Sequence, residues 1–468
     1  MEPEELGQTS KEELIAIILA QAEVIAKQTA ALEQLQADYE ALKMKFDKNR
    51  KPPTTSKNSS QPPSRDQKAN LPAGRRKQRH GPPMGHAKHE RKFVANADQI
   101  VNLRAQACKE CHTDLREEKG QLVKVNQVTE LPETPAQVVE VRQYAVTCPH
   151  CGETQVEKPP EGLEMDRAFG ARLEATVVYY RQEQHLSYER TQKALWDLYQ
   201  VEISQGGIDE IMKRAGELAL QQEAVIRTTI RQSPVIHSDE TGSRMNGDNW
   251  WEWVFCTARA VLHVIRDNRS VDVIKEIMGP AQAKVWVSDC HSAQLKAPAH
   301  QRQLCMSHQL RNLQAVIDTY PSLRWPKAMQ VLFRRAIHLH HQRPQLPPDE
   351  FHLQVTRLER MCDRLLRKPL EPPDAQRLQR RYLKHRLSLF VFLYHTDVEP
   401  TNNVAERALR HSVVHRKVTG CFRSRWGAKT FAALASVIDT AELSGIRAFD
   451  AILSLFGPTS LPLPVCGE

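Results

Sequence analysis

Apolar residues recur every seven positions near the beginning of the sequence. Two seams result, one formed by Ile18, Ile25, Leu32, Tyr39 and Phe46 and the other by Leu14, Gln21, Gln28, Leu35 and Leu42. Such a repeat predicts one long helix over residues 11–48 whose seam is buried against a second helix, as in a coiled coil. Two glutamines weaken the second seam, so a single amphipathic helix docked on its own protein is the alternative.

Residues 164–232 have helical spacing throughout. Ser187 and Ser204 are expected N-caps of two of these helices, because a serine oxygen can accept a hydrogen bond from a backbone N–H of the first turn. Two helices separated by a tight polar turn are compatible with a helix-turn-helix, in which the helix after Ser204 reads the major groove of DNA. A plain packing bundle has the same periodicity, so both interpretations stay open.

From residue 233 the pattern changes to short apolar runs that are typical of strands. Five strands are expected, in SPVIHSDETG, NWWEWVFCTA, AVLHVIRDN, KVWVSDC and RQLCMSH, with the second and third forming a hairpin. Helical spacing returns in residues 308–395 and, after a helix start in TNNVAERALRHSVVHRK, continues to about Ser444. We therefore predict an α/β domain over residues 233–445 with a helical insertion at about 308–395. Residues 446–468, which end in GPTSLPLPVCGE, are expected to form a C-terminal tail.

Residues 49–92 lack a hydrophobic pattern and are rich in Pro, Ser and Lys, which predicts a linker. Its basic cluster consists of Arg75, Arg76, Lys77 and Arg79. A solvated tether and an arm that neutralises DNA phosphates are both compatible with this composition. The whole chain has 65 Lys and Arg against 56 Asp and Glu, a net charge of +9, which favours a polyanionic partner.

Two Cys-x-x-Cys pairs lie in residues 93–163. They are Cys108 with Cys111 and Cys148 with Cys151. Each pair can turn two thiolates toward one tetrahedral zinc ion, so we expect one structural Zn²⁺. The strand-like runs QLVKVNQV and AQVVEVRQYAV between the pairs predict a zinc ribbon with an inserted hairpin. Unrelated cysteines or a redox pair are the alternatives.

Composition also bears on the compartment in which the protein works. Ten cysteines are too few for a disulfide scaffold in a chain of 468 residues, which indicates a reducing compartment. No apolar run approaches the ~20 residues that span a bilayer. The acidic first residues do not have the basic start of a signal peptide. We expect a soluble, intracellular protein.

Three carboxylates fall at the ends of predicted elements. Two strands each end in an aspartate, Asp239 and Asp289, and the later helix places Glu406 in its first turn. Such carboxylates can converge on two Mg²⁺ ions, because hard cations prefer oxygen ligands, and two ions ~4 Å apart promote phosphoryl transfer. The order of the elements fits a ribonuclease-H-like fold. Glu240 adjoins Asp239, but neighbours on a strand point to opposite faces, so only one of them would face the ions.

Glu406 also has a structural interpretation. Asn403 and Glu406 have the spacing of a capping box, in which Asn403 is the N-cap and Glu406 bonds a backbone N–H. On the catalytic interpretation, Arg410 and Lys417 lie on the same face of the helix as Glu406 and would hold DNA phosphates beside the ions. Both interpretations are compatible with the sequence.

From the linker onward the motifs resemble those of the insertion-sequence 66 family of DDE transposases. The resemblance is carried by TSKNSSQPPS, the paired cysteines, YRQEQHLSYERTQ, HSDETG, VSDCHSAQ, CMSH, NNVAERALR with the RK that follows, and AELSG. It implies a ribonuclease-H-like catalytic domain with a helical insertion, and Asp239, Asp289 and Glu406 match the acidic triad of the family. The implied activity is metal-dependent DNA strand cleavage and strand transfer during transposition, with two Mg²⁺ or Mn²⁺ ions as cofactors.

The resemblance also implies partners and a location. The partners are the transposon ends and target DNA, further copies of the chain, and small companion proteins of the same element. The location is the bacterial cytoplasm, at the nucleoid. Cys305 and His308 match a Cys-x-x-His element of related transposases, for which metal binding and a buried structural role are both open.

Two other functions remain compatible with the sequence. A catalytically inactive, transposase-derived regulator would need only the zinc module, the helix-turn-helix and the basic arm to bind DNA. A nuclease would use the same acidic residues, with water as the nucleophile in place of a DNA 3′-hydroxyl.

Overall fold

The computed structural model describes residues 10–49, 55, 57–59, 93–119, 121–129, 131, 136–159 and 167–457. The chain divides into two units. One comprises Met1–Gln67, Val141–Gln192 and Ile203–Glu468, and the other comprises Lys68–Glu140 and Lys193–Glu202. The basic cluster of Arg75, Arg76, Lys77 and Arg79 lies outside the described residues, as does the end of the expected C-terminal tail.

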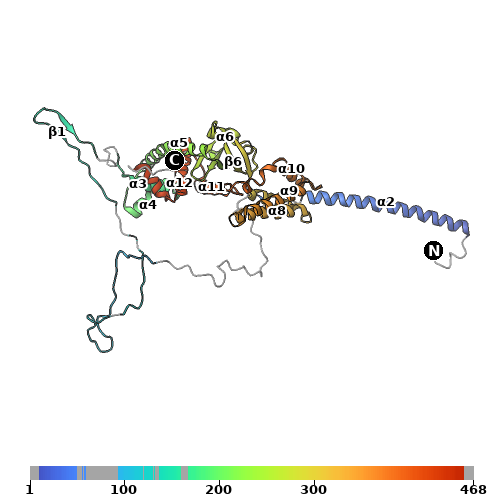
Figure 1. Cartoon of the computed structure of the whole chain (residues 1–468), viewed down its shortest axis with the longest axis horizontal. Helices are drawn as coiled ribbons and strands as arrows, with labels where there is room; N and C mark the ends of the chain where they lie inside the picture. Colours follow the sequence, from blue (N-terminus) through green and yellow to red (C-terminus); the bar gives the residue numbers. More distant parts are fainter. Residues whose placement is uncertain are drawn as a thin grey trace. The chain divides into compact units, whose positions relative to one another are not determined.

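Five strands form one mixed sheet in the first unit (Figure 1). They are β3 (Val235–Met245), β4 (Asp248–Cys256), β5 (Val261–Arg266), β6 (Ala283–Ser288) and β7 (Ala299–Leu304), in the order β5-β4-β3-β6-β7. β3, β4 and β5 are antiparallel neighbours, whereas β6 is parallel to both β3 and β7. The five expected strands are confirmed, although the last ends at Leu304, before CMSH. This mixed α/β core is compatible with a ribonuclease-H-like domain.

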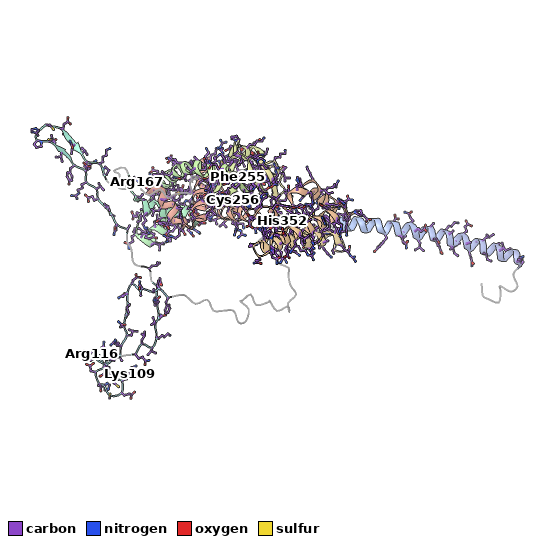
Figure 2. The ribbon with its side chains drawn as sticks, in the orientation of Figure 1. Lys109, Arg116, Arg167, Phe255, Cys256 and His352 are labelled. Carbon is purple, nitrogen blue, oxygen red and sulfur yellow. The ribbon has the colours of Figure 1, made fainter. Side chains whose placement is uncertain are left out.

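Two helices cover one face of the sheet. Helix α11 (Asn403–Thr419) packs Ala405 and Leu409 against Val254 and Cys256 of β4. Helix α12 (Arg425–Leu443) buries Phe431 in a cluster with Met245 and Ile265 of β3 and β5. Phe255 adjoins Cys256 on β4 (Figure 2) and, by the alternation of strand residues, points to the opposite face, where its ring meets Trp286 edge on.

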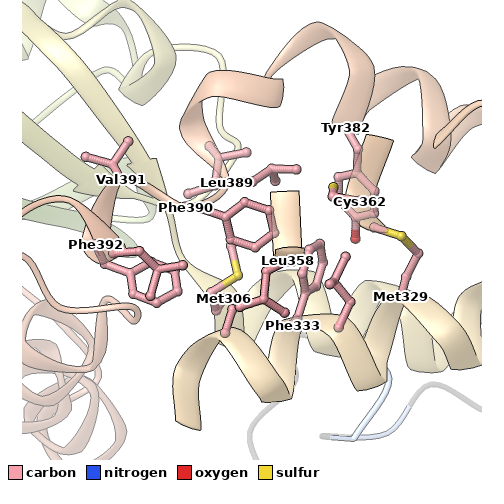
Figure 3. Packing of buried hydrophobic residues seen from close by; sticks show 14 of the residues in the cluster. Met306, Met329, Phe333, Leu358, Cys362, Tyr382, Leu389, Phe390, Val391 and Phe392 are labelled. Carbon is pink, nitrogen blue, oxygen red and sulfur yellow. The ribbon is translucent and has the colours of Figure 1, made fainter. Parts of the chain in front are cut away.

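The helical insertion between β7 and α11 is confirmed and begins at Met306. It consists of α7 (Met306–Thr319), α8 (Arg324–Gln342), α9 (Pro348–Leu366) and α10 (Pro373–Lys384), followed by short 3₁₀ turns. Its buried rings of Phe333, Tyr382 and Phe390 gather beside Met306 and Leu358 (Figure 3). The same apolar cluster contains Val235, Val285, Val287 and Leu304 of the sheet. The insertion and the sheet therefore share one core.

Helices precede the sheet, as the periodicity predicts. They are α3 (Ala171–Gln182), α4 (Tyr188–Tyr199) and α5 (Gln205–Gln232). The N-cap predictions are confirmed, because Ser204 Oγ accepts the Gly207 N–H at 3.0 Å and Ser187 Oγ accepts the Arg190 N–H at 3.2 Å. Helix α5 packs along α12 and leads into β3. The helix-turn-helix itself stays a prediction.

Close contact between α5 and α12 depends on one glycine. A Cβ atom at Gly216 of α5 would lie 2.3 Å from Thr430 Oγ1 of α12, far inside van der Waals contact. A hydrogen at this position lets the two helices approach, and both residues are buried. The helical region before the sheet is thus packed firmly onto the α/β domain at this point.

The expectation of a tail from residue 446 needs correction. Residues Ala448–Phe456 form helix α13, which packs against α3 and α12 and buries Ala451, Ile452 and Phe456. The chain also does not stay helical throughout the segment before it. Gly420, with a φ of 74°, ends α11 and separates it from α12. A left-handed residue of this kind commonly ends a helix, and glycine adopts it without a steric cost.

The first segment is the long helix α2 (Lys11–Asn49), 39 residues in length, so the helix is confirmed. Several of its seam residues are exposed, namely Ile18, Ile25, Leu32, Leu35 and Tyr39. Pairing with a second helix stays a prediction. None of the helices in the described part of the chain combines the length and the apolar composition needed to cross a bilayer.

The cysteine-containing segment has less strand than expected. A short antiparallel hairpin joins β1 (Ala145–Thr147) to β2 (Thr154–Val156). The run QLVKVNQV forms no strand, and only the last two residues of AQVVEVRQYAV do. Leu122, Val123 and Val138 are exposed in these runs. Strand propensity reflects packing on a half-buried surface, and these side chains have no such surface to pack on.

Candidate active site

The register of the sheet brings the two aspartates to the same face of adjacent strands. In the parallel ladder, Val235 pairs with Val285 and His237 with Val287. Alternate strand residues share a face, so the next residues on that face are Asp239 of β3 and Asp289, which directly follows β6. Asp239 and Asp289 thus lie on the same face of the sheet as the buried residues that precede them on each strand.

Asp239 does not end its strand, which corrects the sequence-based expectation. Strand β3 continues to Met245, because its second half pairs with β4 as far as Asp248. The parallel ladder with β6 stops earlier, at His237. Asp239 therefore lies inside the long β3–β4 hairpin but beyond the last parallel pair, where β3 and β6 no longer bond to each other.

Glu406 projects from the first turn of α11, whose start is held by Asn402. The N-cap is Asn402 rather than Asn403, and it makes no side-chain capping bond. Instead its Nδ2 donates to the carbonyl of Ser238 at 2.8 Å, next to Asp239. The capping box, which was the alternative structural interpretation of Glu406, is therefore not formed, and the side chain of Asn402 makes a tertiary contact instead. The Glu406 carboxylate points elsewhere, since its Oε1 accepts a hydrogen bond from Arg311 Nη2 at 3.4 Å.

Asp239 lies within electrostatic range of both Asp289 and Glu406. Burial raises the pKa of Asp239 well above its usual value, and the negative charges of Glu240, Asp289 and Glu406 raise it further. The Glu240 N–H donates to Asp239 Oδ1 at 3.0 Å and opposes this shift. A partly buried group of carboxylates, which offers only oxygen ligands, suits hard divalent cations such as Mg²⁺.

Glu240 has a different role from Asp239. It accepts hydrogen bonds from Arg269 at 2.6 and 2.9 Å and from Gln294 Nε2 at 2.6 Å. Gln294 belongs to the loop after Asp289, where the His291 N–H donates to Asp289 Oδ1 at 2.7 Å. Glu240 thus ties β3 to the loop that carries the second aspartate, on the face away from Asp239.

Helix α7 contributes three further side chains beside Glu406. His308 Nδ1 lies 3.5 Å and Arg311 Nη2 lies 3.4 Å from Glu406 Oε1, and Cys305 is the N-cap residue of α7. Burial and then the Arg311 guanidinium lower the pKa of His308 to about 4, which makes its ring neutral at pH 7. The sequence analysis missed Arg311. Its position three residues after His308, on the same helical face, was the available signal.

Cationic side chains lie further along α11. Arg410 and Lys417 are exposed. Arg416, which the sequence analysis did not single out, donates from Nη1 to Thr241 Oγ1 at 3.4 Å, two residues beyond Asp239. Exposed cations on the helix that carries Glu406 are available to phosphate groups.

The two cysteine pairs form turns with the same backbone pattern. The Cys108 N–H donates to Thr113 O and the Cys148 N–H donates to Glu153 O. In each turn the fourth residue after the first cysteine, His112 or Gly152, has a positive φ, of 58° and 77°, and donates its N–H back to the carbonyl of that first cysteine.

Hydrogen bonds in these turns favour thiolates. The side-chain and backbone bonds of Thr113 lower the pKa of Cys111 to about 7, and bonds from the Cys151 and His150 backbone lower the pKa of Cys148. A thiolate is the form of cysteine that binds metal. Each turn, taken by itself, therefore has the local chemistry of half a zinc site.

Comparison with known proteins gives one clear result. The sequence model described as Transposase IS66 family matches residues 167–430, more than half of the chain, and the match includes all three carboxylates. A search of the curated proteins finds no match.

Proposed function

We propose that this chain, which belongs to the Transposase IS66 family, is an active enzyme that cuts DNA strands and joins them to a target. The single observation that best supports the proposal is that the partly buried Asp239 lies within electrostatic range of both Asp289 and Glu406. Such a site is costly for a folded protein unless cations occupy it, because like charges at close range disfavour ionisation. A regulator that only binds DNA would have no use for it.

The carboxylates suit two Mg²⁺ ions, with Mn²⁺ as a substitute, that would stabilise the attacking and leaving oxygens of the transferred phosphate. The protein's own part is to hold the three carboxylates. Asn402 fixes the start of α11 against β3, and Glu240 fixes the loop of Asp289. Arg311 places a positive charge beside Glu406, where it limits repulsion within the site.

DNA binding is assigned to several regions outside the carboxylate site. Arg410 and Lys417 would contact phosphates next to it, and the basic cluster of Arg75, Arg76, Lys77 and Arg79 would neutralise phosphates from the linker. The helices of residues 164–232 would recognise the transposon ends. We assign catalysis to residues 233–445.

Labelled DNA from the ends of the element tests this function directly. Purified protein with Mg²⁺ and target DNA should give joined products. Cut products without joining would indicate a nuclease, and binding without either product would indicate a regulator. Both of those outcomes contradict the proposal, provided that the DNA fragment is shown to bind.

The four cysteines Cys108, Cys111, Cys148 and Cys151 are proposed to hold one structural Zn²⁺ per chain. Replacing Cys148 with Ser should release this zinc and unfold the module of residues 93–163, because zinc binding and folding are coupled in small modules. Metal analysis and limited proteolysis measure the two effects. Cys421→Ser removes a cysteine outside the module and serves as the control. The assignment is contradicted if metal analysis finds no zinc in wild-type protein that was purified under reducing conditions.

Self-association is proposed for residues 11–48. The exposed seam of α2 would be buried against a second copy, as its heptad spacing suits. Deleting residues 11–48 should lower the mass measured by light scattering by much more than the deleted residues account for. The matched control replaces exposed charged residues between the seams, such as Glu23 and Lys27, with Gln. An unchanged mass after the deletion would show that α2 is not the association element.

A further inference from the structure

Cys305, His308 and Glu406 form a cluster of a different chemical kind from the aspartates. One ligand atom of each residue, a thiol sulfur, a ring nitrogen and a carboxylate oxygen, lies within 4.8 Å of the others. Cys305 is fully buried, and His308 and Glu406 are partly buried. Cys305 and His308 alone would not make a site, but the fold adds Glu406 as a third donor from another helix.

Backbone hydrogen bonds fix the thiol in position. The Cys305 N–H donates to the carbonyl of Ser288 at 2.8 Å, and Cys305 Sγ accepts the Asn402 N–H at 3.2 Å. Cys305 begins α7 and Asn402 begins α11, so the sulfur lies where two helix N-termini meet. The backbone N–H groups at the two helix N-termini favour negative charge at this point. Burial outweighs them and raises the pKa of Cys305 to about 11, so the thiol would give up its proton only when a cation binds.

One donor in the cluster lacks a partner. His308 Nδ1 is buried and accepts or donates no hydrogen bond, although Glu406 Oε1 lies 3.5 Å away. Buried polar atoms in native proteins are nearly always satisfied, and a bound ion is one of the few explanations for an exception. A cation held between the nitrogen, the sulfur and the oxygen would satisfy all three atoms.

We propose that Cys305, His308 and Glu406 bind a single thiophilic divalent cation, with Zn²⁺ as the preferred ion. Sulfur and imidazole donors select Zn²⁺ over Mg²⁺, whereas the neighbouring aspartates offer only oxygen. Three protein ligands leave the fourth tetrahedral position to water. Arg311 Nη2 lies 3.4 Å from the same Glu406 oxygen and would compete with the ion for it. The catalytic role of Glu406 rests on the proposed function, whereas the zinc site does not.

Zinc binding to the full-length protein tests the proposal. Competition with a fluorescent chelator, with Zn²⁺ as the only added metal, gives the number of sites and their affinities. His308→Ala and Cys305→Ser should each hold one equivalent less than the wild type, or bind it more than about tenfold more weakly. The matched controls are His340→Ala and Cys362→Ser, which remove a histidine and a buried cysteine from α8 and α9. Both controls should keep the wild-type count.

The comparison separates this site from the other proposals. If the four paired cysteines bind no zinc, the number of zinc ions bound per chain falls in every variant. The difference of one zinc ion between the wild type and His308→Ala remains. If DNA is not cleaved, the zinc count is unaffected. Circular dichroism verifies each fold. His308→Gln, which keeps a polar side chain at the site, replaces any variant that unfolds and should show the same loss. Equal zinc counts and affinities in the wild type and the folded variants overturn the proposal, as does an equal loss in the controls.

Discussion

Glu406→Gln is expected to be a folded, DNA-binding protein that neither cuts nor joins DNA. The neutral amide removes one negative charge from the site and is a poor ligand for a hard cation. A metal centre contributes several kcal/mol to transition-state stabilisation, and each ~1.4 kcal/mol changes a rate tenfold. The rate of strand cleavage should therefore fall by at least about 100-fold, as it should for Asp239→Asn and Asp289→Asn. Cleavage of labelled end DNA under single-turnover conditions measures the effect.

The matched control is Glu350→Gln, the same chemical change at an exposed position in the first turn of α9. It should cleave at the wild-type rate. Because Glu406 takes no part in the helix cap, a loss of cleavage in Glu406→Gln cannot be ascribed to a lost capping hydrogen bond. Near wild-type cleavage by Glu406→Gln together with inactive aspartate variants would mean that the third carboxylate ligand lies elsewhere.

The stability of Asp239→Asn tests the metal site independently of DNA cleavage. The pKa of Asp239 is raised in the folded protein, so its ionisation at pH 7 opposes folding. Without added metal, the variant should be more stable than the wild type, and the wild type should gain stability as pH falls and Asp239 protonates. Mg²⁺ should stabilise the wild type more than the variant. Thermal unfolding with and without Mg²⁺ measures this, and equal Mg²⁺ effects in both proteins would argue against a metal at Asp239.

The second large effect is expected at His263, a buried histidine that joins β5 to α12. Its Nδ1 lies 3.0 Å from Glu252 Oε1 and its Nε2 lies 2.9 Å from Asp439 Oδ2. Burial opposes protonation, but hydrogen bonds with Asp439 and Glu252 outweigh it and raise the pKa of His263 to about 10. His263→Gln should destabilise the protein by about 3–5 kcal/mol, because two carboxylates lose their cation.

The pH dependence follows from the direction of this shift. A histidine with a raised pKa contributes its full stabilisation below pH ~6.5, the value in the unfolded chain, and loses it as pH rises toward 10. The difference in unfolding free energy between wild type and His263→Gln should therefore shrink between pH 6.5 and pH 10. Urea unfolding at several pH values measures it. His338→Gln, at an exposed position on α8, is the control and should show no such trend. A constant difference across this range would show that His263 is neutral.

Much of the fold could be predicted because the signals are local. The five strands are apolar runs bounded by polar turns, and Ser204 is a cap whose partner lies three residues away. The order of Asp239, Asp289 and Glu406 along those elements was enough to propose the candidate site. Its assignment as the catalytic centre still rests on the experiments described above.

The remaining features depend on contacts between distant residues. The length of β3 beyond Asp239 is set by its pairing with β4. Asn402 begins α11 because its side chain reaches Ser238, 164 residues earlier in the sequence. His263 meets Asp439 across 176 residues. Periodicity identifies a buried position but does not identify the distant residue that will face it, so these partners became visible only in three dimensions.

The chain enters and leaves the helical insertion at one place. The Met306 N–H donates to the carbonyl of Pro400 at 2.9 Å, and the Asn402 N–H reaches Cys305 Sγ at 3.2 Å. A segment whose ends meet can change in length at little cost, since doubling a flexible loop adds only about 0.6 kcal/mol of closure entropy. The length of chain between Cys305 and Asn402 can therefore vary without separating the two ends that position Glu406, provided that His308 and Arg311 of the first helix are kept beside it. A segment of different length must still bring an apolar face of its own, because Val285, Val287 and Leu304 would otherwise be uncovered.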